Sequence, residues 1–216
     1  MTYGLSALVS RRDFLTITAL LPGALAGCIG ANRPPAPRHF YLMPLTAVSG
    51  DLPQVTWSLA VDPPETVPAL DTTRIALAFS ENEFDYYADA EWGDAAPIMV
   101  QQVIIGSFQK SGRIGVVVNE RERMRTDFQL TSFLAPFFAA GRKGAAPEVR
   151  LGLNVQLIKS RGRQTVGTRA INRAAQSSGA DIASIVAAFN TGMQQVLEDL
   201  VAWTIRTGAT AATAAS

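Results

Sequence analysis

The chain has 216 residues, enough for one domain with a substantial core, and it carries 19 basic against 18 acidic side chains. This balance predicts neither a strong field for nucleic acid nor a polybasic membrane patch. A single cysteine and a single histidine leave no ligand set for the common zinc sites, so we expect no metal centre.

The first 27 residues have the pattern of an export signal. Arg11 and Arg12 resemble a twin-arginine signal, an apolar run follows, and Leu25-Ala26-Gly27-Cys28 resembles a bacterial lipobox. The apolar run is too short to span a bilayer, which needs roughly 20 apolar residues. We therefore expect residues 1–27 to be removed and Cys28 to carry an acyl and diacylglycerol lipid, with no other cofactor. The alternative is a buried helix, which the Pro22-Gly23 pair disfavours.

Residues 28–38 are rich in proline and predict an extended tether, followed by a domain over residues 39–207. A short strand is expected at 39–43. Alternating apolar residues predict further strands at 57–61 and 75–79. A polar turn over 80–83 leads to another run at 84–88, which predicts a hairpin.

A helix is expected next, with Asp94 as its N-cap, Pro97 in its first turn and Ser111-Gly112 at its end. Strands are predicted at 114–118, at 128–138 with a bend at Pro136, and as a second hairpin at 149–157 and 163–173. Asp181 begins a long amphipathic helix with an apolar stripe through Trp203. The segment 208–216 is of low complexity and predicts a disordered tail.

The order of these elements predicts the fold class. A hairpin followed by a helix occurs twice, which predicts an α+β pseudo-repeat with an antiparallel or mixed sheet and two helices packed on one face.

Few residues point to catalysis, and we assign no catalytic residue. A Ser-His-Asp triad would have to use His39, which lies beside the tether, and the sequence has no phosphate-binding glycine loop with Lys-Ser/Thr. Arg121, Arg123 and Arg125 alternate with glutamates and predict an exposed connector, with a weak indication of a docking surface. An acidic cluster leaves a carboxylate pair open, although a solvated hairpin edge explains it better: Glu81, Glu83, Asp85, Asp89, Glu91 and Asp94.

Two aromatic segments are candidates for contacts with partners or lipid. Tyr86, Tyr87 and Trp92 lie beside acidic residues just before a helix, which suits a partner or lipid contact, with Tyr87 or Trp92 partly exposed. The alternative is that these rings cover the start of the helix. Phe133–Phe138 predicts a strand buried on both faces, or else the wall of a groove for acyl chains.

The combination resembles the ABC-type transport auxiliary lipoprotein family, also described as PqiC-like. The resembling features are the Cys28 lipobox, Phe40-Tyr41-Leu42, Trp57-Ser58-Leu59-Ala60-Val61, Asp71-Thr72-Thr73-Arg74-Ile75, the segment Tyr86–Trp92 and the last helix with Ala187-Ala188-Phe189 and Trp203. The resemblance implies a periplasmic lipoprotein that works with an MCE-domain protein and an ABC permease and ATPase. Such systems move phospholipids or other hydrophobic molecules across the envelope.

We therefore expect a non-enzymatic accessory protein that is lipid-anchored in the periplasm, more in keeping with the outer membrane than the inner one. A homo-oligomer stays open, and no nucleic-acid partner is expected. Two alternatives remain: a structural or assembly lipoprotein of an outer-membrane complex, and an envelope hydrolase with a carboxylate site.

Overall fold

The computed structural model describes residues 36–48, 50–80, 83–142 and 144–214. The chain divides into residues 1–36 and a compact unit Pro37–Ser216, and only the compact unit is described below. Arg11 and Arg12, the predicted acylation site Cys28 and most of the predicted tether lie outside the described residues. The expectations for them stay predictions.

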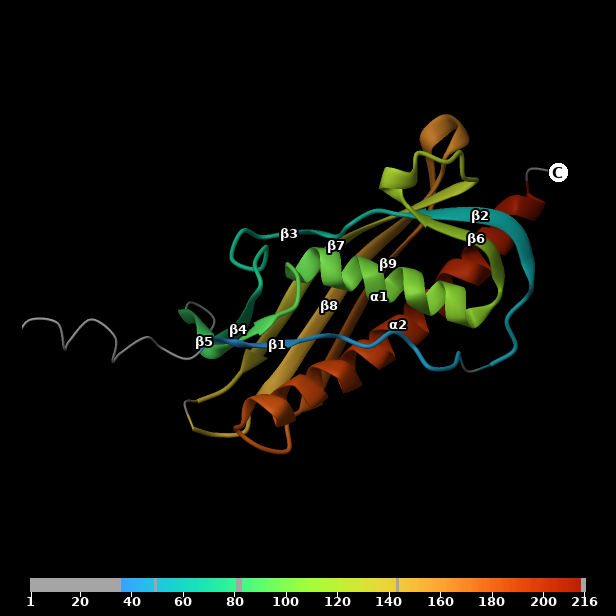
Figure 1. Ribbon diagram of the computed structural model, residues 1–216. Helices are drawn as coiled ribbons and strands as arrows, with labels where there is room; N and C mark the ends of the chain where they lie inside the picture. Colours follow the sequence, from blue (N-terminus) through green and yellow to red (C-terminus); the bar gives the residue numbers. More distant parts are fainter. Residues whose placement is uncertain (1–35, 49, 81–82, 143, 215–216) are drawn as a thin grey trace, which may run out of the picture. The chain divides into compact units, whose positions relative to one another are not determined.

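In this part of the chain a nine-stranded mixed sheet carries two long helices, which confirms the predicted α+β class (Figure 1). Helix α1 spans Ala96–Ser111 and α2 spans Ile182–Thr213, and two short 3-10 helices are η1 (Glu120–Glu122) and η2 (Arg161–Arg163). The strands are β1 (Arg38–Phe40), β2 (Val55–Val61), β3 (Glu65–Thr66), β4 (Arg74–Ser80), β5 (Glu83–Trp92), β6 (Ile114–Asn119), β7 (Phe128–Ala140), β8 (Glu148–Lys159) and β9 (Gln164–Gln176).

Strand β7 lies inside the sheet and pairs with other strands along both of its edges. One edge pairs antiparallel with β8 along nearly its whole length, and β8 pairs antiparallel with β9. The other edge pairs in parallel with β2 near its start, with β3 in its middle and with β4 at its end. Strand β4 continues to β5 and then β1, while β2 continues to β6. Segments distant in sequence therefore meet at each end of β7.

Both helices cover one face of the sheet. In β8 the residues that face the helices are buried, and the intervening Arg150, Asn154 and Gln156 are exposed, as the alternating pattern predicts. Helix α2 packs on β8 and β9, and α1 packs beside β6 and β2. Each helix follows a hairpin, β4–β5 before α1 and β8–β9 before α2, which is the predicted pseudo-repeat.

The helix termini agree in part with the predicted caps. Asp181 caps α2, because its Oδ1 accepts a hydrogen bond of 3.0 Å from the backbone N–H of Ser184. The predicted cap Asp94 is wrong by one residue: Ala95 is the N-cap of α1, and the Asp94 carboxylate instead accepts a bond from the Ala95 N–H. Gly112 ends α1 in the left-handed region, with φ of 62°.

An extended strap follows β1 and lies on the helices. The Met43 N–H donates to Asn190 and its carbonyl accepts from Gln194, both on α2, while the Leu45 N–H donates to Ser107 on α1. The predicted strand at 39–43 is therefore shorter, because the backbone beyond Phe40 bonds helix side chains and no neighbouring strand.

The expected disordered tail from Gly208 is wrong through Thr213. Helix α2 continues to Thr213, and Gly208 is buried in it. A Cβ built on Gly208 would lie 2.5 Å from Cζ2 of Trp57, so the glycine allows the helix to pass close to the β2 side chain. The small residues that suggest low complexity serve a close helix–sheet contact here.

Strand β7 is not buried on both faces. Phe133 is 38% exposed, whereas Phe137 lies in the core at 1%, so the apolar run has one core face and one outer face. The pairing with β8 shifts register between Leu134 and Phe137, around Pro136, where a bend was predicted. None of the helices in the described part of the chain combines the length and apolarity that crossing a bilayer requires.

Candidate interaction site

Trp92, one of the three predicted contact residues, belongs to the core. It ends β5, is 1% exposed, and its ring centroid lies 5.7 Å from that of Phe137 on β7 and 5.1 Å from that of Phe189 on α2. The expectation that Trp92 contacts a partner is therefore wrong, because its ring packs in the core against both the sheet and α2. This is the alternative in which the aromatic segment covers the helix layer.

Tyr86 and Tyr87 differ from Trp92 because both are half-buried. The Tyr86 hydroxyl donates a hydrogen bond of 2.9 Å to the Ala69 carbonyl, and the guanidinium carbon of Arg74 lies 3.9 Å from the centre of the Tyr86 ring. Burial raises the pKa of the Tyr87 hydroxyl above its ordinary value. Both tyrosines are held in place and keep some surface for a partner.

Phe84, Tyr86 and Phe138 form an aromatic patch on the outer face of the sheet. The Phe84 ring lies 6.1 Å from Tyr86 and 5.5 Å from Phe138, edge to face, and Phe84 is 41% exposed. Phe138 pairs with the exposed Arg150 of β8, which places the patch on the face away from the helices. Exposed aromatic clusters of this kind are typical of contact surfaces.

A larger feature lies at the other end of β7. A hollow of about 1010 Å³ opens between the end of β2, the η1–β7 connection, the β8–β9 turn and the last turn of α2. We call it the tip hollow. Its lining is Trp57, Ala60, Asp62, Glu120, Met124, Arg125, Thr126, Asp127, Phe128, Gln129, Lys159, Ser160, Arg161 and Ala212.

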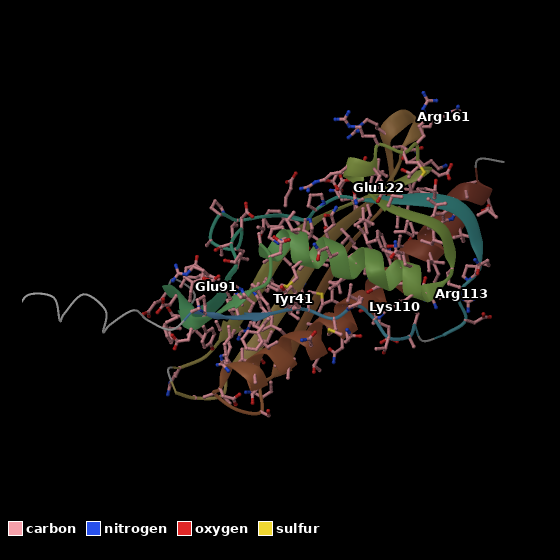
Figure 2. The ribbon with its side chains drawn as sticks, viewed as in Figure 1. Tyr41, Glu91, Lys110, Arg113, Glu122 and Arg161 are labelled. Atoms are coloured by element: carbon pink, nitrogen blue, oxygen red, sulfur yellow. The ribbon has the colours of Figure 1, made fainter. Side chains whose placement is uncertain are left out.

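The register of the sheet explains how the tip hollow forms. Phe128 at the start of β7 pairs with Lys159 at the end of β8, and Lys159 pairs with Gln164 at the start of β9. Two charged loops, 120–127 and 159–163, are therefore neighbours although they are far apart in sequence. Figure 2 shows Arg161 at this end of the unit, with Glu122 below it and Tyr41 and Glu91 far from it.

The carboxylates in the tip hollow bond the protein's own donors. Asp127 accepts bonds of 2.8 Å from both the N–H and the hydroxyl of Ser58. Glu120 accepts from the Gln101 amide at 2.6 Å, and one Asp62 oxygen accepts from Gln129 at the same distance. These bonds tie α1, β2 and β7 together.

Asp62 differs from the other carboxylates of the tip hollow in its pKa and in having one oxygen without a hydrogen-bond partner among the described residues. Burial raises the pKa of its carboxyl above the ordinary value, the Gln129 hydrogen bond opposes this shift, and the Glu120 charge adds to it. Its second oxygen, Oδ1, is buried without a hydrogen-bond partner among the described residues. Asp62 therefore holds a proton more readily than an exposed aspartate does.

The described members of the predicted acidic cluster do not form a metal site. Across the described part of the chain, no group of three or more His, Cys, Asp or Glu side chains is arranged to hold a metal ion. Glu81 of that cluster lies outside the described residues, and Glu91 is placed to accept from the Thr73 hydroxyl at 3.3 Å.

A second hollow, of about 580 Å³, lies over the outer face of β7, β8 and β9. Phe133 lines it, but most of its other lining side chains are polar, among them Asn154, Gln156 and Thr168. This lining does not resemble the apolar wall that the acyl-chain alternative requires.

Sequence reasoning missed the tip hollow, although a signal for it exists. Arg121, Arg123 and Arg125 stand directly before one predicted strand, and Lys159, Arg161 and Arg163 stand at a predicted hairpin turn. When the strands predicted at 128–138 and 149–157 pair antiparallel, both basic groups lie at the same end of the sheet. The net charge of the whole chain is balanced, so it does not reveal that these basic groups gather at one end.

The chain resembles known proteins in both sequence and fold. A protein from Bradyrhizobium diazoefficiens is 26% identical over 148 residues, which cover 68% of this chain and 39% of that protein, so the chain spans about two fifths of that relative. A crystal structure from Xanthomonas campestris, described as DUF330, is 27% identical, covers 81% of this chain and 99% of its own, and superposes with a TM-score of 0.75.

A second crystal structure, 11% identical, covers 77% of this chain and 97% of its own with a TM-score of 0.60, and it shows the likeness of fold alone. The family described as ABC-type transport auxiliary lipoprotein component matches residues 41–201, from the strap to the middle of α2. The chain therefore belongs to the family of ABC-type transport auxiliary lipoprotein components.

Proposed function

We propose that the chain is a lipid-anchored periplasmic accessory component of an MCE/ABC-type system that moves phospholipids or other hydrophobic molecules across the envelope. Family membership over residues 41–201 is the observation that carries this proposal. The partners are an MCE-domain protein and an ABC permease and ATPase. ATP hydrolysis belongs to another subunit, because the sequence has no phosphate-binding loop of the Lys-Ser/Thr type.

The lipobox supports the anchor. Cys28 lies ten residues before Arg38, where β1 begins, so a short proline-rich tether joins the lipid to the folded unit. Ile29 follows the cysteine where an aspartate would favour retention in the inner membrane, and this favours the outer membrane. Arg11 and Arg12 favour the twin-arginine export route.

The anchor is tested by Cys28→Ser. We expect this variant to lose lipoprotein processing and membrane fractionation, because only the thiol accepts the diacylglycerol. Two or more acyl chains, at about 0.8 kcal/mol per buried methylene, make release from the membrane slow in the wild type. Unchanged processing of the variant would contradict the lipobox assignment.

The aromatic patch and Tyr87 are the proposed contact with the transport partner. Half-buried aromatic rings on a rigid strand suit such a contact, because little side-chain freedom is lost on binding. Arg74 and Ala69 hold the Tyr86 ring in place, which favours a preformed surface.

Co-purification tests the transport role. The tagged, lipidated chain is extracted from membranes in mild detergent, and its partners are identified, with Phe84→Ala as the test variant and Met43→Ala as the control. Both side chains are exposed apolar groups, but Met43 lies on the strap. We expect an MCE-domain protein with the wild type and the control, and less of it with Phe84→Ala. Recovery of an outer-membrane assembly complex in its place would support the structural alternative.

A further inference from the structure

Three cations of the tip hollow lack partners among the described residues. Arg125, Lys159 and Arg161 line it, and among the described residues none of their side chains forms an ion pair or a hydrogen bond. Arg125 and Arg161 are exposed, and Lys159 is half-buried. Arginine and lysine are the side chains that bind phosphate and carboxylate groups most readily.

The charges around the hollow favour an anion. Six cations lie in the two loops, from Arg121 to Arg125 and from Lys159 to Arg163, against four carboxylates: Asp62, Glu120, Glu122 and Asp127. The carboxylates accept hydrogen bonds from protein groups, and Glu122 does so in a capping box with Asn119. These ten groups sum to a net charge of +2. In the lining itself, the three cations stand beside three carboxylates, Asp62, Glu120 and Asp127.

One wall of the same hollow is apolar. The Trp57 and Phe128 rings meet edge to face with centroids 5.0 Å apart, and Phe128 is only 2% exposed. Met124, 49% exposed on the connection before β7, is the accessible part of this wall. The Nε1–H of Trp57 is buried and has no acceptor among the described residues, and the residue is 6% exposed. A buried donor without a partner is rare, and this one lies on the side of the ring that packs against Gly208 of α2.

The loops on both sides hold arginines in an unfavourable backbone conformation. Arg123 and Arg163 each have φ of 49°, in the left-handed region that favours glycine. Arg123 follows η1 and Arg163 ends η2, so they flank the hollow. Neither side chain is among those that line the hollow, so this conformation describes the loops and is not an argument for a ligand.

We propose that the tip hollow binds an amphiphile with an anionic phosphate head group, of the phospholipid class. The phosphate lies against Arg125, Lys159 and Arg161. The apolar part lies against Met124, Phe128 and Trp57. This inference rests on the proposed transport function: the auxiliary subunit binds cargo itself in addition to docking onto the protein that carries it.

An acidic peptide is the competing ligand, and the apolar wall disfavours it. Glutamate and aspartate side chains would use the cations and leave the Trp57–Phe128–Met124 wall without a partner. Free inorganic phosphate shares the head-group chemistry and likewise leaves this wall uncovered.

Titration calorimetry tests the proposal on the full chain carrying Cys28→Ser, so that its own acyl chains do not compete. The probe is dihexanoyl phosphatidylglycerol, kept monomeric, with inorganic phosphate and a hexaglutamate peptide as comparison ligands. The test variant is Arg125→Gln/Arg161→Gln. The matched control is Lys110→Gln/Arg113→Gln, two cations at the end of α1 that do not line the hollow (Figure 2).

We expect saturable binding of the lipid, weakened about tenfold or more by the test variant and unchanged in the control, because charge-assisted hydrogen bonds are lost in the former alone. Met124→Gln is expected to weaken the lipid and leave inorganic phosphate unchanged. Inorganic phosphate itself is expected to bind at least about tenfold more weakly than the lipid, since it gains nothing from the apolar wall.

Three results would overturn the proposal: no saturable lipid binding, equal loss in both double variants, or hexaglutamate or phosphate binding as tightly as the lipid. The outcome is separable from the proposed function. If the chain binds no lipid in calorimetry but the lipidated chain still co-purifies with the MCE-domain partner, the proposed lipid site alone is contradicted. Intact lipid binding without any transport partner contradicts the proposed function alone.

Discussion

Gly208→Val tests how the end of α2 packs. Gly208 is buried in the helix, and a Cβ there would lie 2.5 Å from Cζ2 and 2.9 Å from Cε2 of Trp57. Both atoms belong to a rigid ring that also packs against Phe128, so the contact is not relieved by turning a flexible side-chain end. The branched valine adds two methyl groups to the same place.

The magnitude follows from two opposing effects. Replacing glycine inside a helix by valine gains a few tenths of a kcal/mol of helix propensity, because valine loses less backbone freedom. Overpacking a buried contact costs about 1–3 kcal/mol. We expect a net loss of about 2 kcal/mol, which for a protein of this size lowers Tm by roughly 4–8 °C.

Thermal unfolding monitored by circular dichroism measures this effect, with Thr210→Val as the matched control. Thr210 is exposed in the same helical turn, and the substitution keeps a β-branched side chain, so Tm should stay close to that of the wild type. Equal Tm values for both variants and the wild type would refute the packing of this turn on Trp57 and would restore the disordered tail.

Trp92→Ala is expected to cost about 3–5 kcal/mol of folding stability, whereas Tyr86→Ala should chiefly reduce partner binding, by roughly 2 kcal/mol; melting and pull-down in parallel separate the two, and equal Tm losses would contradict the assignment. The raised pKa of Asp62 means that its proton stabilises the folded state below the unfolded pKa of 3.8 and that this stabilisation is lost as pH rises through the folded pKa. Asp62→Asn should remove this pH dependence, so that the free energy of unfolding measured with urea changes less with pH in the acidic range. An unchanged slope would contradict the raised pKa of Asp62. Arg11→Lys with Arg12→Lys should block export although charge is kept, and normal export of this variant would indicate the general secretory route.

The regular elements were predictable because their signal is local. The strand at 149–157 alternates without a break, and β8 contains it. The apolar stripe from Ile182 to Trp203 likewise predicted α2, and the Asp181 cap fixed its start. Periodicity in these segments reflects one buried face, and neighbours from elsewhere in the chain do not alter it.

The remaining features depend on long-range packing. Trp92 looks like a surface aromatic in its acidic sequence context, but the β4–β5 pairing turns its ring towards Phe189 of α2. Gly208 resembles the start of a flexible tail, and only the position of Trp57 on β2 explains it.

The tip hollow shows the same limit. Its two loops meet only through the register of β7 with β8, in which Phe128 pairs with Lys159. Neither loop by itself predicts a site. Composition averaged over the chain gives a balanced charge, while the fold gathers six cations at one end.

The movement of phospholipid in cells tests the central claim most directly. Newly made, isotopically labelled phospholipid is followed between the inner and outer membranes in cells that lack this chain, the partner ATPase, or both. The account predicts the same altered distribution in all three, with no added effect in the double deletion and recovery with the lipidated wild-type chain. An unchanged distribution without this chain, beside an altered one without the ATPase, would contradict it.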